Sequence, residues 1–315
     1  MESLKPKIAI IGAGKVGSTF AFSLMISGLA REIVLIDKNE FLAKGECMDL
    51  NHGSSLAHPT KIYASRYEGC EDADIVVITA GSGQKPGQSR IDLVKDNVEI
   101  FKEIIPAIAK YAEDAILLVV TNPVDILTYV TLKISGFATN KVMGSGTVLD
   151  TSRLKFMISE YCKVDSGNIH AYIIGEHGDT ELPVWSNATI AGMAIEKYCT
   201  KYAKLPNVSI ELPEIFEKVK NSAYQIIEAK GATNYAIGLA LVKITKSILR
   251  NENTILPVST LINDYYDVSD VCLSIPSHVN KNGVEQYLKL DLSEKEQELF
   301  KYSADTLKKI IKTVM

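Results

Sequence analysis

A histidine in the second half of the chain has the surroundings that proton transfer requires. His177 lies in the segment Gly175-Glu176-His177-Gly178-Asp179, directly after an apolar run that predicts a strand. A histidine at a strand end between glycines is open to a cleft, and its pKa suits proton transfer near neutral pH. A lone histidine is more often structural, so a catalytic role for His177 depends on a partner for its imidazole.

The segment VLDTSR at 148–153 supplies an acidic and a basic candidate. Asp150 could fix the tautomer of His177 and stabilise its charged form, although the sequence alone does not show that the two residues meet. Arg153 follows three positions later, which places both side chains on the same side of a helix. Its guanidinium can bind a substrate carboxylate through two hydrogen bonds, whereas a surface salt bridge is its more common role.

Near the N-terminus, the segment GAGKVG at 12–17 matches the pattern G-x-G-x-x-G. The pattern alone is weak, but here it follows a predicted strand and precedes a predicted helix, as dinucleotide binding requires. The glycines let the backbone approach a pyrophosphate, and the helix N-terminus offers free N–H groups. Asp37 ends the second strand, 20 residues after Gly17. Its carboxylate can accept hydrogen bonds from ribose hydroxyls and repels a 2′-phosphate, so we expect NAD rather than NADP; a helix cap or turn residue is the alternative.

Two further segments follow predicted strands and carry candidate ligand-binding groups. Residues 81–90, GSGQKPGQSR, contain three glycines and a proline, which is typical of a mobile loop. We expect this loop to close over the substrate, to bring Arg90 with it and to exclude water; a solvent-exposed turn is the alternative. Asn122, in the segment TNPVD at 121–125, ends a strand where open α/β sheets bind ligands. It is a candidate to hydrogen-bond the nicotinamide or the substrate, although Asn-Pro is also a common turn.

Alternating strands and helices position these residues in the first half. Continuous apolar, largely β-branched runs predict buried parallel strands over 8–11, 33–36, 75–78 and 116–120, and periodicity predicts a helix over 15–28. Such alternation builds a doubly wound sheet.

The second half changes character. The patterns predict one strand over 170–174 and helices over 214–229 and 234–250, and apolar side chains recur every three to four residues from Phe300 to Val314. The last pattern predicts that the chain ends in an amphipathic helix.

The 315 residues suffice for about two domains, and 46% of them are apolar, which supports a sizeable core. We therefore predict an α/β fold. A Rossmann NAD-binding domain with a doubly wound parallel sheet covers 1–145, and an α+β substrate or catalytic domain covers 146–315.

The charge and the N-terminal sequence limit the other partners. The net charge of −4 gives no electrostatic case for a nucleic acid or an anionic membrane surface. No apolar run approaches the ~18 residues of a membrane span, and the N-terminus lacks the features of a signal peptide, so we expect a cytoplasmic protein.

The five cysteines are odd in number and widely spaced, without a C-x-x-C pair. We expect no disulfide framework and no metal site, and we interpret the cysteines as small buried hydrophobic residues in a reducing compartment. They are Cys47, Cys70, Cys162, Cys199 and Cys272.

Taken together, these segments make the chain similar to the L-lactate/malate dehydrogenase family over nearly its whole length. The resemblance lies in GAGKVG at 12–17, Asp37, the loop 81–94, TNPVD at 121–125, LDTSR at 149–153, GEHGD at 175–179 and KGATNYAIG at 230–238. It implies a reversible hydride transfer between NADH and pyruvate that gives L-lactate, and a homotetrameric assembly.

The resemblance also implies a role for each matching residue. His177 would give a proton to the carbonyl oxygen and take it back in lactate oxidation, and Asp150 would orient His177. Arg153 would hold the carboxylate, Arg90 would polarise the carbonyl, Asn122 would lie beside the nicotinamide, and Thr233 would contact the small end of the substrate. Cofactor contacts would come from Gly12, Gly14, Val16, Gly17, Asp37, Gly81 and Asn122.

One position separates the substrates of this family. The residue at Gln84 is typically arginine where the substrate carries a second carboxylate, as oxaloacetate does. A neutral glutamine leaves that carboxylate unpaired in a closed site, which costs several kcal/mol, so pyruvate is expected. A malate or branched 2-hydroxyacid dehydrogenase is the alternative enzyme, and a dinucleotide-binding regulator without catalysis is the alternative from another class.

Regulation is left open by two other positions. Relatives that fructose 1,6-bisphosphate activates bind it between subunits with an arginine and a histidine. The matching residues here are Lys155 and His170, and the lysine keeps the charge but loses the two-pronged geometry of a guanidinium.

Overall fold

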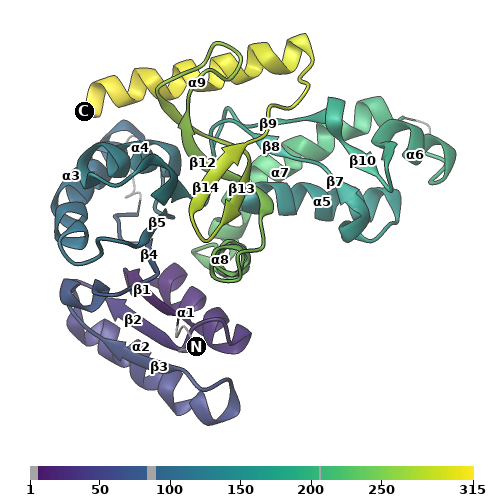
Figure 1. Cartoon of the computed structure of the whole chain (residues 1–315). Coiled ribbons are helices and arrows are strands. Elements are labelled where there is room, and N and C mark those ends of the chain that lie inside the picture. Colours follow the sequence, from purple (N-terminus) through teal and green to yellow (C-terminus); the bar gives the residue numbers. More distant parts are fainter. Residues whose placement is uncertain (1–5, 84–89, 206) are drawn as a thin grey trace.

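A computed structural model of the chain describes residues 6–83, 90–205 and 207–315. It has a large sheet with helices on both of its faces and a second group of helices and short strands beside it (Figure 1). The nine-stranded sheet has the order β14-β13-β12-β6-β5-β4-β1-β2-β3. Its strands are β1 (Lys7–Ile11), β2 (Glu32–Ile36), β3 (Lys61–Ala64), β4 (Ile75–Ile78), β5 (Ile116–Val119), β6 (Val142–Gly144), β12 (Thr254–Ile262), β13 (Val271–Asn280) and β14 (Gly283–Tyr287).

The first six strands are parallel and confirm the predicted doubly wound fold. Each of the four strand predictions in this half falls on an observed strand, and β1, β4 and β5 lie side by side at the centre of the sheet. The residues of β4 and β5 are all buried, because helices cover both faces of a parallel sheet. The order 3-2-1-4-5-6 places the crevice for a ligand at the carboxyl ends of β1 and β4.

Nine helices occur among the described residues, and each predicted helix falls on one of them. They are α1 (Lys15–Ser27), α2 (Glu40–His52), α3 (Arg90–Ala109), α4 (Val124–Ser135), α5 (Val148–Cys162), α6 (Ile195–Lys201), α7 (Val208–Lys230), α8 (Tyr235–Leu249) and α9 (Glu294–Val314). None of the helices in this part of the chain is long and apolar enough to cross a membrane.

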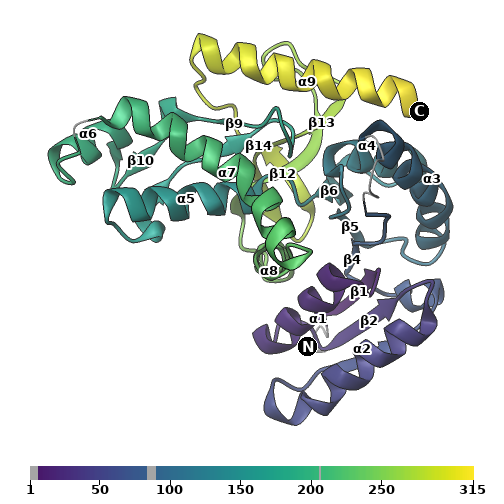
Figure 2. The ribbon, with the colours of Figure 1, turned by 180° about the vertical axis from the view of Figure 1, so that it is seen from behind.

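The second half of the chain contributes both to the large sheet and to its own layers. Strand β12 pairs antiparallel with β6, β13 with β12 and β14 with β13, so the sheet runs through both halves. Helix α9 lies across this extension and ends near α3 and α4 in both views (Figures 1 and 2). Its apolar stripe, which includes Phe300 and Leu307, is buried as predicted.

The single strand predicted over 170–174 is wrong in one respect. The chain forms two short strands there, β7 (Ile169–His170) and β8 (Ile173–Ile174), which belong to different sheets. β7 pairs with β10 (Thr189–Ile190), which pairs in turn with β11 (Met193–Ala194), whereas β8 pairs with β9 (Leu182–Pro183). The apolar run continues through both strands because both are packed against the interior, so the pattern could not reveal the change of partner.

Helix α7 begins earlier than predicted. The pattern predicts a start at residue 214, directly after Pro213, whereas the helix starts at Val208 and contains this proline. Val208 and Leu212 are buried against the cluster that also contains Ile215, and this packing favours helix on both sides of the proline.

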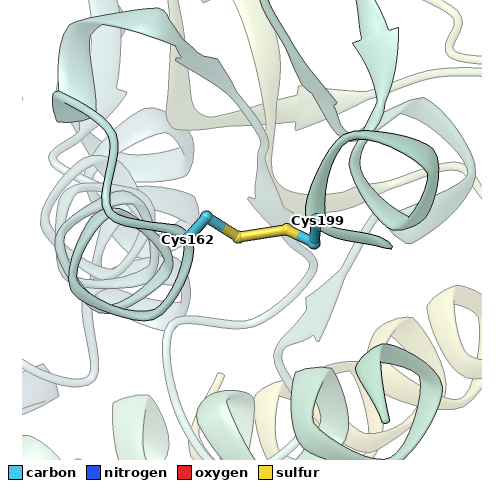
Figure 3. The surroundings of a disulfide bond; sticks show 2 residues. All are labelled: Cys162 and Cys199. Carbon is cyan, nitrogen blue, oxygen red and sulfur yellow. A yellow bond between two sulfur atoms is a disulfide. The ribbon is translucent and has the colours of Figure 1, made fainter. Parts of the chain in front are cut away.

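The expectation that every cysteine is unpaired is wrong. Cys162, at the end of α5, and Cys199, in α6, form a disulfide (Figure 3). The other three, Cys47, Cys70 and Cys272, are free and buried. Since 37 residues separate the two bonded cysteines, spacing in the sequence did not indicate the pair.

Candidate active site

The glycine segment forms a tight turn between β1 and α1 that excludes side chains. The N–H of Gly12 donates to the carbonyl of Ile36 at 2.7 Å, and the φ angle of Gly12 is +103°. A Cβ atom on Gly17 would lie 1.9 Å from the carbonyl oxygen of Gly12. A Cβ atom on Gly14 would have no neighbour within 4 Å, so at this position the backbone is open to a ligand. A cradle of this kind fits a pyrophosphate at the N-terminus of α1.

Asp37 stands beside this turn, at the carboxyl end of β2. Its side chain is half-buried and accepts hydrogen bonds from the backbone N–H of Ala13 at 2.7 Å and of Asn39 at 2.8 Å. These two bonds fix the carboxylate next to the glycine turn. The position fits the recognition of an adenosine ribose by a carboxylate.

His177 and Asp150 meet at the centre of the second site, as the sequence suggested without being able to show it. The Nδ1 atom of His177 lies 2.5 Å from Oδ2 of Asp150, and Nη1 of Arg153 donates to Oδ1 of the same carboxylate at 2.8 Å. Asp150 is 3% exposed, in the first turn of α5, and Arg153 lies one turn further along. One buried carboxylate therefore orients both an imidazole and a guanidinium.

The charges of this group support one another. Burial by itself would lower the pKa of His177, but the Asp150 carboxylate outweighs it and raises the pKa to about 9. Burial likewise would raise the pKa of Asp150, but the His177 and Arg153 charges hold it below its ordinary value. The imidazole is thus held in its charged, proton-donating form at neutral pH.

A second buried carboxylate, Asp125, holds the backbone of the histidine. Its Oδ2 accepts the N–H of His177 at 2.7 Å, and its Oδ1 accepts the hydroxyl of Ser259 at 2.6 Å. Burial raises the pKa of Asp125 to about 6, against the lowering effect of these bonds. Asp125 belongs to the predicted TNPVD segment, but its role had no signal in the sequence because its partner lies 52 residues away.

The loop that carries His177 is also anchored from the C-terminal helix. The hydroxyl of Ser303 in α9 accepts the N–H of Glu176 at 2.8 Å. Gly175 has a φ angle of +89°, and a Cβ atom there would lie 2.9 Å from that hydroxyl oxygen. Gly175, two residues before the histidine, is therefore required by the close approach of α9.

Asn97 of α3 joins the start of the predicted closing loop to the end of β5. Its side-chain oxygen accepts the N–H of Ser82 at 2.7 Å, and its amide donates to the carbonyl of Asn122 at 2.9 Å. The Asn97 side chain is fully buried. Sequence reasoning missed it, because an asparagine inside a helix has no motif that marks it.

These groups surround a cavity of about 930 Å³. Of the residues predicted from the sequence, six line it: Val16, Gly81, Asn122, Asp150, Arg153 and His177. The cavity therefore reaches from the first turn of α1 to the histidine. Helix α7 forms another wall, which includes Lys220 and Tyr224.

Other predicted residues lie elsewhere or cannot be placed. Thr233 is half-buried in the connection between α7 and α8 and is not among the described residues that line the cavity. His170 is exposed in β7, and Lys155 is half-buried in α5, where burial lowers its pKa. Gln84 and the side chain of Arg90 lie outside the described residues.

The fold and the site define a class: a two-part oxidoreductase with a Rossmann cofactor domain and a histidine–aspartate pair for proton transfer. Comparison with known proteins agrees. Residues 6–144 match the model of the lactate/malate dehydrogenase NAD-binding domain, and residues 147–315 match that of its alpha/beta C-terminal domain. The chain belongs to the lactate/malate dehydrogenase family.

Curated relatives cover almost the whole chain. An L-lactate dehydrogenase of Acetivibrio thermocellus is 56% identical over 98% of this chain and 97% of its own length. An L-lactate dehydrogenase of Priestia megaterium is 50% identical over 96% and 94%. Among solved structures, the minor L-lactate dehydrogenase of Enterococcus mundtii matches with a TM-score of 0.96 and 40% identity, covering 99% of both chains.

Proposed function

We propose that the protein is an NAD-dependent L-lactate dehydrogenase that reduces pyruvate to L-lactate and catalyses the reverse reaction. The observation that carries the proposal is the group of His177, Asp150 and Arg153 in a cavity that continues to the first turn of α1. It contains a proton donor and a carboxylate-binding guanidinium next to a dinucleotide cradle. A 2-oxo acid needs these groups for reduction.

The mechanism follows from the charges of the site. Arg153 binds the carboxylate of pyruvate and so turns the carbonyl toward His177. When bound, the cofactor supplies a hydride to the carbonyl carbon. His177 donates its proton to the carbonyl oxygen as negative charge develops there, and Asp150 keeps the ring in the required tautomer. In lactate oxidation the neutral imidazole accepts the proton of the hydroxyl group.

The proposed residue roles extend the sequence predictions. Asn122 lines the cavity that Val16 and His177 also line, which fits a contact with the nicotinamide. Arg90 begins α3. We propose that the segment 81–90 closes over the substrate, as its sequence predicts, and brings Arg90 to the carbonyl. Thr233 is proposed to approach the substrate in that closed state. Residues 1–145 would then serve cofactor binding and residues 146–315 catalysis.

The first experiment compares two substrates. NADH oxidation is followed by its absorbance with pyruvate and, in parallel, with oxaloacetate. We expect fast turnover of pyruvate and at least 100-fold lower kcat/KM for oxaloacetate, because an unpaired carboxylate costs several kcal/mol in a closed site. Preference for oxaloacetate would refute the substrate and would leave the His177 chemistry intact.

Substitution at position 84 tests the reason for that preference. In Gln84→Arg the new guanidinium would pair with the second carboxylate, so the ratio of kcat/KM for oxaloacetate to that for pyruvate should rise by orders of magnitude. Gln84→Asn keeps the site neutral and serves as the control. An unchanged ratio in Gln84→Arg would show that another group decides the substrate.

We also propose that the chain assembles with copies of itself into a tetramer. Large apolar side chains are exposed on neighbouring helices: Phe22 of α1, Phe41 and Met48 of α2, and Tyr235 and Leu239 of α8. Residues of α1, α2 and α8 also line a cavity of about 640 Å³. A monomer rarely exposes such a surface, and a second copy would cover it. Light scattering should give four times the chain mass of 34.5 kDa, and a monomer would refute assembly.

Fructose 1,6-bisphosphate is the proposed regulator, bound between subunits by Lys155 and His170. The exposed imidazole of His170 supports this, whereas the half-buried lysine lacks the fork of an arginine, so we expect weak activation. Pyruvate kinetics and assembly are measured with and without the sugar bisphosphate. If neither changes, the two residues have no regulatory role. Cytoplasmic location follows from the family and is proposed with it.

A further inference from the structure

A third carboxyl group stands beside the histidine–aspartate pair. Glu181 lies in the turn after His177 and directly before β9, where its N–H donates to the carbonyl of Gly178 at 3.2 Å. Its side chain lines the same cavity and the residue is only 7% exposed. One carboxylate oxygen of Glu181, one of Asp150 and one ring nitrogen of His177 all lie within 4.8 Å of one another. The imidazole therefore has two carboxyl groups as neighbours.

The two carboxyl groups differ in how they are held. Both oxygens of Asp150 accept hydrogen bonds, from His177 and Arg153. Among the described residues, no side chain donates a hydrogen bond to Glu181, and its charged neighbours act on it across space. A buried carboxyl group without a fixed donor is unusual, because burial of an unpaired charge is costly.

The charged groups around Glu181 come from three elements. Asp150 and Arg153 face it from α5, Lys220 faces it from α7, and His177 faces it from the adjacent turn. Burial and the neighbouring Asp150 raise the pKa of Glu181 to about 8, while the three cations work in the opposite direction. His177 is further influenced by Asp125 of α4, which holds its backbone.

We propose that Glu181 is a positioning residue of the reaction, a second carboxyl group that, when it is ionised, acts with Asp150 to stabilise the positive charge of His177 before the proton is donated. The proposal rests on the role proposed for His177. Asp150 sets the orientation of the ring, and Glu181 adds negative charge that Asp150 alone cannot provide, since its own charge is shared with Arg153.

The direction of the effect follows from the charges. Below about pH 8 Glu181 holds a proton and acts weakly on the imidazole. At higher pH it ionises, and its negative charge then favours the proton on His177. Pyruvate reduction needs the charged ring, so Glu181 extends this reaction to more alkaline pH. Lactate oxidation needs the neutral ring, so Glu181 delays its onset.

The test is the pH dependence of kcat/KM between pH 6 and pH 10 in Glu181→Gln, which keeps the size of the side chain and removes its charge. An opposite charge within about 4–6 Å changes a pKa by about one unit or more. We therefore expect the alkaline decline of pyruvate reduction to begin about one pH unit lower, with about tenfold lower kcat/KM at pH 9 and less than about threefold change at pH 6.5. The pH at which lactate oxidation begins should also be about one unit lower in Glu181→Gln.

Two variants serve as controls. Glu99→Gln removes a carboxylate of α3 that pairs with Lys102 at 2.8 Å, has a side chain that is 71% exposed and is not among the described residues that line the cavity; its pH profile should match that of the unaltered protein. Glu181→Asp keeps the charge and should restore most of the alkaline activity. Thermal unfolding of each variant shows whether the fold is intact.

The outcomes separate the two proposals. If Glu181→Gln loses the same factor at every pH, or loses nothing, Glu181 does not act on the charge of His177 and the inference is overturned. If the unaltered protein does not turn over pyruvate, the proposed function itself is refuted. If it turns over pyruvate but shows no alkaline decline, His177 is not the titrating donor and both roles are refuted.

Discussion

Replacing Asp150 with asparagine removes the charge at the centre of the site with little change in shape. The residue is 3% exposed, and its carboxylate lies 2.5 Å from the His177 ring and 2.8 Å from the Arg153 guanidinium. An asparagine oxygen can still accept from Arg153, so carboxylate binding should be largely retained. The neutral amide does not stabilise the positive charge of the imidazole. Either its NH₂ group or its oxygen would face Nδ1 of His177.

The size of the loss follows from the pKa of the ring. His177 changes from 6.5 to about 9 in the folded protein, although burial opposes the charge. This difference corresponds to about 3 kcal/mol of preference for the charged form at about 1.4 kcal/mol per pH unit. Without Asp150 the pKa should fall below 6.5, so less than about one-tenth of the rings are charged at pH 7.5. Misorientation of the ring adds to this, and we expect a total loss of about 10²- to 10⁴-fold in kcat.

The assay is steady-state NADH oxidation at saturating pyruvate, which gives kcat, from pH 6 to pH 9. In Asp150→Asn the rate should fall most steeply above pH 7, while NADH affinity should stay within about twofold because the glycine turn and Asp37 are unchanged. Asp165→Asn, an exposed aspartate beyond the end of α5, is the control for loss of an acidic group. A kcat within threefold of that of the unaltered protein at pH 7.5 would refute the argument that Asp150 acts on His177.

Three further predictions concern the scaffold. Gly17→Ala should weaken NADH binding by at least about tenfold in a fluorescence titration, because the new Cβ would lie 1.9 Å from the Gly12 carbonyl; unchanged affinity would contradict the cradle. Asp125→Ala leaves the N–H of the active-site histidine without its acceptor, so the unfolding free energy should fall by about 1–3 kcal/mol, and Tm and kcat should fall with it. Asp125→Asn keeps an acceptor oxygen and should retain most of the stability and of the activity. Reduction of the Cys162–Cys199 bond should lower Tm, by at most about 4 kcal/mol in unfolding free energy for a 37-residue separation, and peptide mass spectrometry without reductant must find the linked pair.

Local patterns in the sequence predicted four of the six parallel strands of the first half and the helix that follows the first of them. The strand at 8–11, the glycine turn and the helix at 15–28 are consecutive, and each has a signal within a few residues: β-branched runs, glycine spacing and helical periodicity. Asp37 could be placed beside the turn because one βαβ unit fixes its position relative to Gly17. Parallel strands that are buried on both faces have a continuous apolar pattern, and this pattern predicted β1, β2, β4 and β5.

Only the tertiary structure decided which distant side chains meet. His177 and Asp150 are 27 residues apart, and His177 and Asp125 are 52 apart, so neither contact leaves a periodic signal in the sequence. The same holds for Cys162 and Cys199, which a packed cluster of helices and strands brings together.

The division of the run at 170–174 into two strands has the same cause. A run of apolar side chains indicates that a segment is buried, but the partner of each strand depends on distant segments, here β10 for β7 and β9 for β8. The residue types thus determined which chemistry is available, a proton donor, a carboxylate and a guanidinium. Long-range packing decided that Asp150, which is one helical turn from Arg153, also meets His177, and that Glu181 stands beside them.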